Sequence, residues 1–274
     1  MVCTNCFEKN SPGLVKKLFV IKIGGNVIDD EKQLSSFLDD FAKIKERKIL
    51  VHGGGKIATE LSGKLGIKSK MIDGRRVTDA ETLKVVQMVY GGLINKNIVA
   101  QLQARKCNAI GLTGADANAV LATKREAEVD YGFVGDVKKI NIEKISSLLH
   151  SGLMPVIAPL THDGKGQMLN TNADTMAAAI AEAIAVRYSV TLVYCFEKSG
   201  VLRNVDDENS VIEKINPKGY AQLKREKVIS KGMIPKLDNA FDAVKKKVKC
   251  VAICHANDLL KVISGKNAGT CLVK

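Results

Sequence analysis

The chain has 274 residues, enough for one large domain or two small ones that each bury a core. Forty-six per cent of the residues are hydrophobic, only 4% are aromatic and 23 are glycine, which is typical of a globular α/β protein and excludes a disordered tail or a peptide-sized binder. Lys and Arg outnumber Asp and Glu by 42 to 29, and the net charge of +13 favours anionic partners such as phosphates and carboxylates.

The first half of the chain alternates apolar runs of strand length with helical patterns. The pattern predicts strands at residues 18–23, 49–52 and 109–112. It predicts helices at residues 31–47, 56–65 and, loosened by a pair of glycines, 79–106. Such alternation is typical of parallel strands joined by crossover helices.

The second half continues the alternation after a segment of a different kind. Residues 120–139 alternate polar and apolar side chains around Gly132 and Gly135, which predicts antiparallel ribbons. Further strands are predicted at residues 155–160, 190–195, 249–254 and 270–273, and helices at residues 142–150, at 174–186, from Pro235 onwards and, short, after 254. We therefore expect an α/β fold with a largely parallel open central sheet, helices on both faces and two lobes that share the sheet.

Cysteines and charge runs indicate no obvious metal or nucleic-acid site. Seven cysteines are an odd number in a chain large enough to fold without disulfides, which favours a reduced, cytoplasmic setting. Cys3 and Cys6 form a C-x-x-C, and Cys250, Cys254 and His255 are of the residue types that bind metals. A zinc site needs a second properly spaced pair, so we interpret these cysteines as buried or incidental thiols. The lysine run at 245–249 is interpreted as a solvated helix face, because few aromatic residues accompany it.

Targeting and membrane signals are also missing from the sequence pattern. Residues 1–15 lack the apolar stretch of a signal peptide, and the uncharged run at 145–162 is broken by polar residues and two prolines. We expect a soluble, cytoplasmic protein that has no nucleic-acid or membrane partner.

Two glycine turns follow the first two predicted strands. Lys22 and Ile23 lead into Gly24 and Gly25, and His52 leads into the triple glycine at 53–55. Glycine lets backbone N–H groups approach an anion closely, and the start of the following helix adds a positive dipole. Because ligands of parallel sheets bind at the carboxyl ends of the strands, we expect two anion-binding turns at one sheet edge.

A nicotinamide or flavin enzyme is the first alternative. Gly53, Gly55 and Ala58 match G-x-G-x-x-A, the dinucleotide fingerprint. That fingerprint needs an acidic residue at the end of the next strand, and Asp73 stands at about the right spacing but in a segment that resembles a turn. The sequence also contains no G-x-x-x-x-G-K-[ST], so a Walker-type nucleotide site is not expected.

Five short motifs in order carry a resemblance that covers about residues 18–274. VIKIGG (20–25), VHGGG (51–55), DGRRVT (73–78), LNTNAD (169–174) and GMIPK (232–236) resemble the motifs of the N-acetylglutamate kinases, a branch of the amino acid kinase family. The resemblance implies transfer of a phosphoryl group from MgATP to the γ-carboxylate of an N-acylated glutamate, on the route to arginine. It also implies an N-terminal extension at 1–17, an N-lobe at 18–170 that binds the acylglutamate, and a C-lobe at 171–274 that binds ATP.

By this resemblance Lys22 and Lys236 stabilise the transferring phosphoryl group, and Asp174 holds both lysines in position. Phosphoryl transfer depends on positioning and charge stabilisation, which paired ammonium groups supply. A lone lysine in an apolar strand is costly to bury without a purpose, although it could also extend to the surface. Lys236 stands at a helix start, where a cation is disfavoured unless an anion is present. Asp174 also begins a helix, where it could act as a cap.

The acceptor-binding residues implied by the resemblance are Gly54, Gly55, Arg76 and Asn170, with Asn172 as a weaker candidate. Arg76 would clamp the α-carboxylate with two parallel hydrogen bonds, a geometry that lysine cannot reproduce. Taken alone, Arg76 is more simply an exposed turn arginine and Asn170 a turn-capping residue.

The ATP-binding residues implied by the resemblance are the first glycine turn and two segments of the C-lobe: Gly24, Gly25, Glu197, Lys198, Ser199, Gly200, Val201, Leu202, Val228, Ile229 and Ser230. Two segments depart from the family pattern. Phe196–Glu197 replaces the usual Ser/Thr-Asp, and residues 114–118 replace a Gly-Lys-Asp-Gly-type turn. Mg²⁺ is expected to arrive with the nucleotide, because no dedicated metal-binding motif is visible.

Two alternatives stay open at this point. N-succinylglutamate is the nearest rival acceptor, because the altered turn at 114–118 could reshape the acyl pocket. A ligand-sensing homologue without turnover is the non-enzymatic alternative, although such a protein has no need for paired lysines. The resemblance further implies a homodimer formed through the N-lobe helices. Arginine feedback inhibition is not expected, because residues 1–17 contain Pro12 and Gly13 and predict little helix.

Overall fold

The computed structural model describes residues 16–72, 75–229 and 233–274. Its central feature is an eight-stranded open sheet, parallel except where β13 and β14 pair antiparallel. Its strands in spatial order are β12 (Lys214–Ile215), β14 (Thr270–Leu272), β13 (Cys250–His255), β11 (Ser189–Phe196), β1 (Lys17–Ile23), β2 (Arg47–His52), β8 (Met154–Ile157) and β5 (Ala109–Leu112). The predicted fold class is confirmed.

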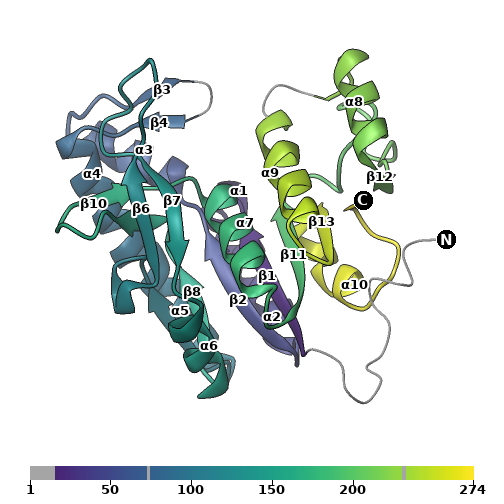
Figure 1. The fold of residues 1–274 in the computed structure, drawn as a ribbon, viewed down its shortest axis with the longest axis horizontal. Coiled ribbons are helices and arrows are strands. Elements are labelled where there is room, and N and C mark those ends of the chain that lie inside the picture. The colour runs from purple at the N-terminus through teal and green to yellow at the C-terminus, as the bar shows by residue number, and fades with distance from the viewer. Residues whose placement is uncertain (1–15, 73–74, 230–232) are drawn as a thin grey trace.

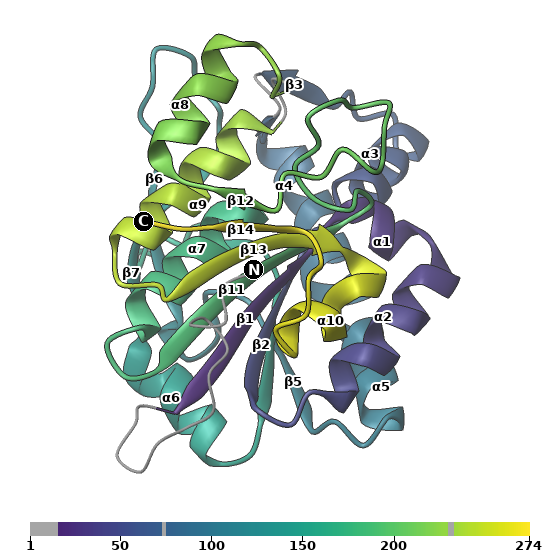
Figure 2. The same ribbon diagram turned by 90° about the vertical axis from the view of Figure 1, so that its right-hand side faces the viewer.

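Helices cover both faces of this sheet and form a core on each (Figure 2). The core on one face is completed by α6 (Ile142–His150), α7 (Ala173–Ile184), α8 (Pro217–Arg225) and α9 (Ile234–Lys245). The core on the other face is completed by α1 (Gly25–Asp29), α2 (Glu31–Lys43), α3 (Gly55–Lys64), α4 (Ala80–Val86), α5 (Asn95–Ala104) and α10 (Leu259–Ile263). In β1 the side chains alternate, so that Leu18 and Val20 face α7 while Phe19 and Ile21 face α2.

A second sheet and a hairpin lie to one side of the main sheet (Figure 1). The second sheet has the order β10 (Met168–Asn170), β9 (Leu160–His162), β6 (Val120–Lys124) and β7 (Gly135–Ile140). β6 and β7 pair antiparallel, which confirms the ribbon expected at 120–139. The hairpin consists of β3 (Lys70–Ile72) and β4 (Arg75–Val77), which pair antiparallel; residues 73–74 between them, where a turn was expected, lie outside the described residues.

The long predicted helix at 79–106 is one continuous helical segment with a change in the middle. α4 leads into a π-helix, η2 (Gln87–Ile94), and this continues as α5. The π-helix contains Gly91 and Gly92, the glycine pair expected to loosen the segment. π-helical turns often occur at functional sites, and this one faces the second glycine turn, as described below.

Several predicted boundaries and elements were wrong. The helix expected at 31–47 ends at Lys43, because Arg47 already begins β2. The strand expected at 155–160 is divided, because β8 ends at Ile157 and Leu160 pairs with β10 in the second sheet. The lysine run is exposed, but α9 ends at Lys245, so the run lies at a helix terminus and not along a helix face.

The thiols of Cys195 and Cys254 lie side by side inside the main sheet, with their sulfur atoms 3.8 Å apart. Hydrogen bonding between the two thiols, together with burial, raises the pKa of Cys254 well above its usual value.

Within residues 16–72, 75–229 and 233–274 no three His, Cys, Asp or Glu side chains group to hold a metal ion. The C-x-x-C at Cys3 and Cys6, and the segment around Pro12 for which the sequence predicts little helix, lie outside the described residues. No helix in the described part is long and apolar enough to cross a bilayer.

Lys48 is a buried cation on β2 that closes the end of α2. Its Nζ donates to the carbonyl oxygens of Phe41 at 2.7 Å, Ala42 at 3.2 Å and Ile44 at 2.6 Å. Burial lowers the pKa of Lys48, the cost of holding a charge in the interior. The last carbonyls of a helix lack their usual partners within the helix, so this ammonium group supplies a donor at the end of α2, where Phe41 O also accepts from Ile44 N at 3.3 Å.

Lys48→Met should therefore lower the free energy of unfolding by about 1–3 kcal/mol, because buried carbonyls lose their donor. Urea denaturation measures this difference. The matched control is Lys43→Met in the last turn of α2, where the lysine side chain is largely exposed and pairs with Asp40; a change within about 0.5 kcal/mol is expected there. Equal midpoints for the two variants would contradict the assignment.

Candidate active site

The two glycine turns lie against one another at the carboxyl end of β1 and β2. Gly24 N donates to Cys195 O, and Gly53 N donates to Ile23 O, so both turns continue the sheet hydrogen bonding. A side chain added at Gly53 would stand only 3.7 Å from the backbone nitrogen of Gly25. Both turns thus lie at one sheet edge, as expected for neighbouring parallel strands.

Lys22 is buried and forms an ion pair inside the protein. It lies on the same face of β1 as Leu18 and Val20, the face that meets α7. Its Nζ stands 2.7 Å from Oδ1 of Asp174 in the first turn of α7, and both residues are 8% exposed. The alternative of a lysine reaching the surface is therefore wrong. Asp174 is also not the helix cap, because Asn172 accepts from Thr175 N at 3.0 Å and caps α7.

The positive charges of both predicted catalytic lysines, Lys22 and Lys236, act on the carboxyl of Asp174. Burial raises its pKa, but the positive charges of Lys22 and Lys236 outweigh burial and leave the pKa below its usual value. Tyr194 is the residue of β11 that pairs with Lys22 of β1. Its hydroxyl donates to the backbone carbonyl oxygen of Asp174 at 3.1 Å. Asp174 therefore stays ionised between two cations, which fits a role in holding them in position.

Lys236 reaches this region from α9, on the third residue of that helix. Its Nζ lies over the ring of Phe196 at 4.9 Å from the centroid. Asn239 Nδ2 donates to Thr175 Oγ1 at 3.3 Å and so ties the start of α9 to the start of α7. The two lysines thus come from a strand and a helix far apart in sequence and interact with one carboxylate.

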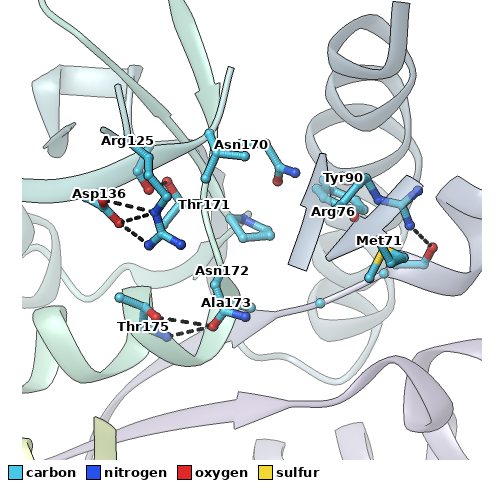
Figure 3. A pocket seen from close by; sticks show the side chains of 16 residues that line it. Met71, Arg76, Tyr90, Arg125, Asp136, Asn170, Thr171, Asn172, Ala173 and Thr175 are labelled. Carbon is cyan, nitrogen blue, oxygen red and sulfur yellow. Dashed lines mark hydrogen bonds and ion pairs between the residues drawn. The ribbon is translucent and has the colours of Figure 1, made fainter. Parts of the chain in front are cut away.

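An open pocket of about 770 Å³ lies beside the second glycine turn (Figure 3). All four predicted acceptor-binding residues, Gly54, Gly55, Arg76 and Asn170, line it. Arg76, Tyr90 and Met71 stand on one side, and Arg125, Asp136 and the start of α7 on the other. Gly54 has φ +146° there, and an added Cβ would lie 2.2 Å from Ile94 Cδ1, so this position requires glycine.

Arg76 is buried in this pocket and is not the exposed turn arginine that its sequence context alone suggests. Its Nη2 donates to Gly55 O at 2.8 Å and Thr59 Oγ1 at 2.7 Å, and its Nη1 donates to Ser69 Oγ at 2.8 Å. Asn170 is a strand residue of β10 and not a turn cap; its Nδ2 donates to Thr78 Oγ1 at 3.0 Å. Through its hydrogen bonds to Gly55 and Thr59, Arg76 fixes the β3–β4 hairpin to the second glycine turn.

A second pocket, of about 870 Å³, collects most of the predicted nucleotide-binding residues. Lys236 lines it together with Phe196, and the loop after β11 is held in place by Val201 N donating to Thr270 Oγ1 at 2.8 Å. The predicted residues in its lining are Glu197, Lys198, Gly200, Val201, Leu202, Val228 and Ile229. Ser199 instead lines a neighbouring pocket. Gly24 and Gly25 lie beside Lys22 and are not part of this lining. Ser230 lies outside the described residues.

Sequence reasoning missed several residues that line the first pocket. Arg125 Nε donates to both carboxylate oxygens of Asp136, across the antiparallel pair β6–β7, and the pair lies at the pocket wall (Figure 3). Tyr90 packs against Gly54 from the π-helix, and burial raises its pKa although the nearby Arg76 charge opposes this. The only sequence signal was indirect: a tyrosine beside the glycine pair and opposite charges on two strands of one predicted ribbon.

The chain is similar to known proteins in both sequence and fold. The sequence profile of the amino acid kinase family matches residues 17–255. The chain is 60% identical over 262 residues to the acetylglutamate kinase of Cytophaga hutchinsonii, covering 94% of this chain and 99% of that protein. It is 40% identical over 247 residues to the acetylglutamate kinase of Methanopyrus kandleri, covering 88% and 96%.

Two solved structures share the fold at low sequence identity. N-acetylglutamate synthase from Neisseria gonorrhoeae, complexed with coenzyme A and N-acetyl-glutamate, superposes with a TM-score of 0.81 at 20% identity and covers 94% of this chain and 59% of its own. Carbamate kinase from Giardia lamblia, bound to AMP-PNP, gives a TM-score of 0.66 at 14% identity and covers 95% and 99%. At such identities the likeness concerns the fold alone.

Proposed function

The chain belongs to the amino acid kinase family, and from this premise we propose that Lys22, Lys236 and Asp174 carry out its chemistry. The reaction is the ATP-dependent phosphorylation of N-acetyl-L-glutamate to N-acetyl-L-glutamyl 5-phosphate in arginine biosynthesis, the activity for which relatives 54–60% identical over most of the chain are named. The protein is a phosphotransferase with a carboxyl acceptor, and its substrates are small molecules.

One observation supports the assignment of roles most directly. The Lys22–Asp174 ion pair lies between two pockets: Ala173 and Thr175, on either side of Asp174 in the chain, line the first, and Lys236, whose charge acts on Asp174, lines the second. We assign the first pocket to the acylglutamate and the second to ATP. This corresponds to an N-lobe at 18–170 and a C-lobe at 171–274, which meet at the start of α7.

In this proposal a γ-carboxylate oxygen of the acceptor attacks the γ-phosphorus of ATP. The bond from the γ-phosphorus to the oxygen that bridges the β- and γ-phosphates breaks, and ADP leaves with that oxygen. Lys22 and Lys236 stabilise the negative charge on the oxygens of the transferring group. Asp174 contributes by holding the two ammonium groups, and its low pKa keeps it ionised. Arg76 and Asn170 orient the acceptor, and Gly54 and Gly55 allow its close approach to the backbone.

Mg²⁺ belongs to the proposal as the partner of the nucleotide. Because the described residues group no three candidate ligands, phosphate oxygens would supply most of its coordination. It would neutralise phosphate charge there.

The homodimer is likewise a proposal. The π-helix carries Met88 and Leu93, which are 54% and 50% exposed, on the N-lobe helices expected to form the interface. A second copy of the chain would cover them. A cytoplasmic setting remains a part of the proposal as well.

A hydroxylamine-trapping assay tests the function. With ATP, the enzyme should form hydroxamate from N-acetyl-L-glutamate with a higher kcat/KM than from N-succinylglutamate, aspartate or free glutamate. ADP release should confirm the ranking and show little turnover with carbamate and UMP. Absence of hydroxamate with N-acetyl-L-glutamate would overturn the proposed function, and a preference for another acceptor would overturn the substrate.

A further inference from the structure

His52 is a buried imidazole beside the second glycine turn that the proposed mechanism does not use. It is 0% exposed and lies on the face of β2 that meets α5, together with Leu50. Burial lowers the pKa of His52 to about 4, although the hydrogen bond to Gly53 O opposes this. The ring is therefore neutral near pH 7, with one nitrogen carrying a proton and the other accepting.

The partners of the ring determine which nitrogen carries the proton. Asn95 Nδ2 donates to Val156 O at 3.0 Å and lies 3.2 Å from His52 Nε2. Asn95 Oδ1 accepts from Lys96 Nζ at 3.2 Å, which fixes the orientation of the amide. An amide nitrogen only donates, so His52 Nε2 must accept. The proton is then on Nδ1, which stands 2.8 Å from Gly53 O and donates to it.

This hydrogen bond fixes the first peptide unit of the glycine turn. In a trans peptide the N–H of Gly54 points away from the C=O of Gly53, so a held carbonyl also sets the direction of that N–H. Gly54 is packed against Ile94 and Tyr90 of the π-helix, which continues directly into Asn95. One helical segment therefore contacts Gly54 and also orients His52.

We propose that His52 is a positioning residue: its Nδ1–H, oriented by Asn95, holds the Gly53 carbonyl so that the Gly54 N–H is presented to the acceptor substrate in the pocket. The inference rests on the proposed function, because it needs the acceptor to bind beside Gly54 and Gly55. A glycine turn is otherwise free to rotate its peptide units, and binding would then have to order them.

Two amide variants, each of which places a side-chain amide near one ring nitrogen, separate the two hydrogen bonds of the ring. In His52→Asn the side-chain amide lies near the former Nδ1 and can still donate to Gly53 O. In His52→Gln the amide reaches the former Nε2 position and can contact Asn95, but it leaves Gly53 O without its donor. We expect His52→Gln to lower kcat/KM for N-acetyl-L-glutamate by about 10- to 30-fold with the KM for ATP unchanged. His52→Asn should stay within about threefold of the parent.

Thermal unfolding of both variants distinguishes this role from simple core filling. If the two variants lose stability but keep equal kcat/KM, or if His52→Asn is as impaired as His52→Gln, the positioning role is wrong. A parent enzyme that fails to phosphorylate N-acetyl-L-glutamate would overturn the proposed function instead.

A measurement on the parent protein keeps the proposal testable even if both variants fail to fold. Nitrogen-15 NMR of the imidazole groups reports the protonated nitrogen of each of the four histidines. One buried ring should show the neutral Nδ1–H form, unchanged between about pH 5.5 and 8.5. If each of the four rings proved to be an Nε2–H tautomer or to titrate in this range, the proposal would be overturned.

Discussion

Replacing Lys22 by alanine is expected to lower kcat by about 10²- to 10⁴-fold, while the KM values of both substrates change by less than about threefold. The buried ammonium group contributes most when charge spreads over the oxygens of the transferring phosphoryl group. In the proposed assignment the two pockets hold the substrates in the ground state, and their linings do not include Lys22. The effect should therefore fall on the chemical step.

Steady-state kinetics with each substrate varied in turn measures this effect. The control is Lys84→Ala, which removes an exposed lysine that pairs with Glu81 on α4, and its kcat should match the parent. Thermal unfolding must accompany the comparison, because Lys22→Ala leaves the buried Asp174 with less compensation for its charge. A folded Lys22→Ala variant with unchanged turnover would refute the catalytic role.

Part of this site follows from strand periodicity alone. The alternation in β1 places Lys22 on the face shared by Leu18 and Val20, and α7 is the helix that covers it. A sequence that predicts a buried lysine and a helix-start aspartate therefore contains the elements of the ion pair, although not their distance. The same periodicity assigns His52 to the opposite face of the sheet, towards α5.

Other features depended on contacts that sequence patterns do not encode. Arg76 is buried where Gly55 and Thr59 of α3, and Ser69 just before β3, accept from its guanidinium group. Nothing in its own segment predicts those partners. The division of the strand expected at 155–160 likewise depends on Leu160 joining a second sheet, a tertiary contact that overrides the local apolar run.

The residues of the second pocket, which we propose to bind ATP, were predicted mainly through resemblance, and they converge for a reason visible in the topology. The loop at 197–202 follows the central strand β11, and Lys236 lies in the first turn of α9, the helix that packs beside α7. Because parallel strands end at one edge, loops distant in sequence meet there. The pairing of Lys236 with the Phe196 ring could not have been predicted, since it depends on where α9 begins relative to β11.

Arg76→Lys should raise the KM for N-acetyl-L-glutamate by about 10- to 100-fold, equivalent to about 1.4–2.8 kcal/mol of binding free energy, and leave the KM for ATP unchanged. The guanidinium already donates to Gly55 O, Thr59 Oγ1 and Ser69 Oγ while it lines the pocket that we propose for the acceptor. A lysine ammonium has three donors on a single nitrogen, so it cannot span these acceptors and still contact a carboxylate.

The substrate that shows the change in KM decides whether the lobes are assigned correctly. The matched control is Arg105→Lys, an arginine at the end of α5 that pairs with Asp39 and donates to Ser35 Oγ, outside both pockets. Its kinetics should equal those of the parent. If Arg76→Lys instead raised only the KM for ATP, the pocket beside the glycine turn would bind the nucleotide, and the assignment of the two lobes would be reversed. An increase confined to the acceptor ties the hairpin at β3 and β4 to recognition of the acylglutamate, because Arg76 is the contact through which that hairpin reaches the turn.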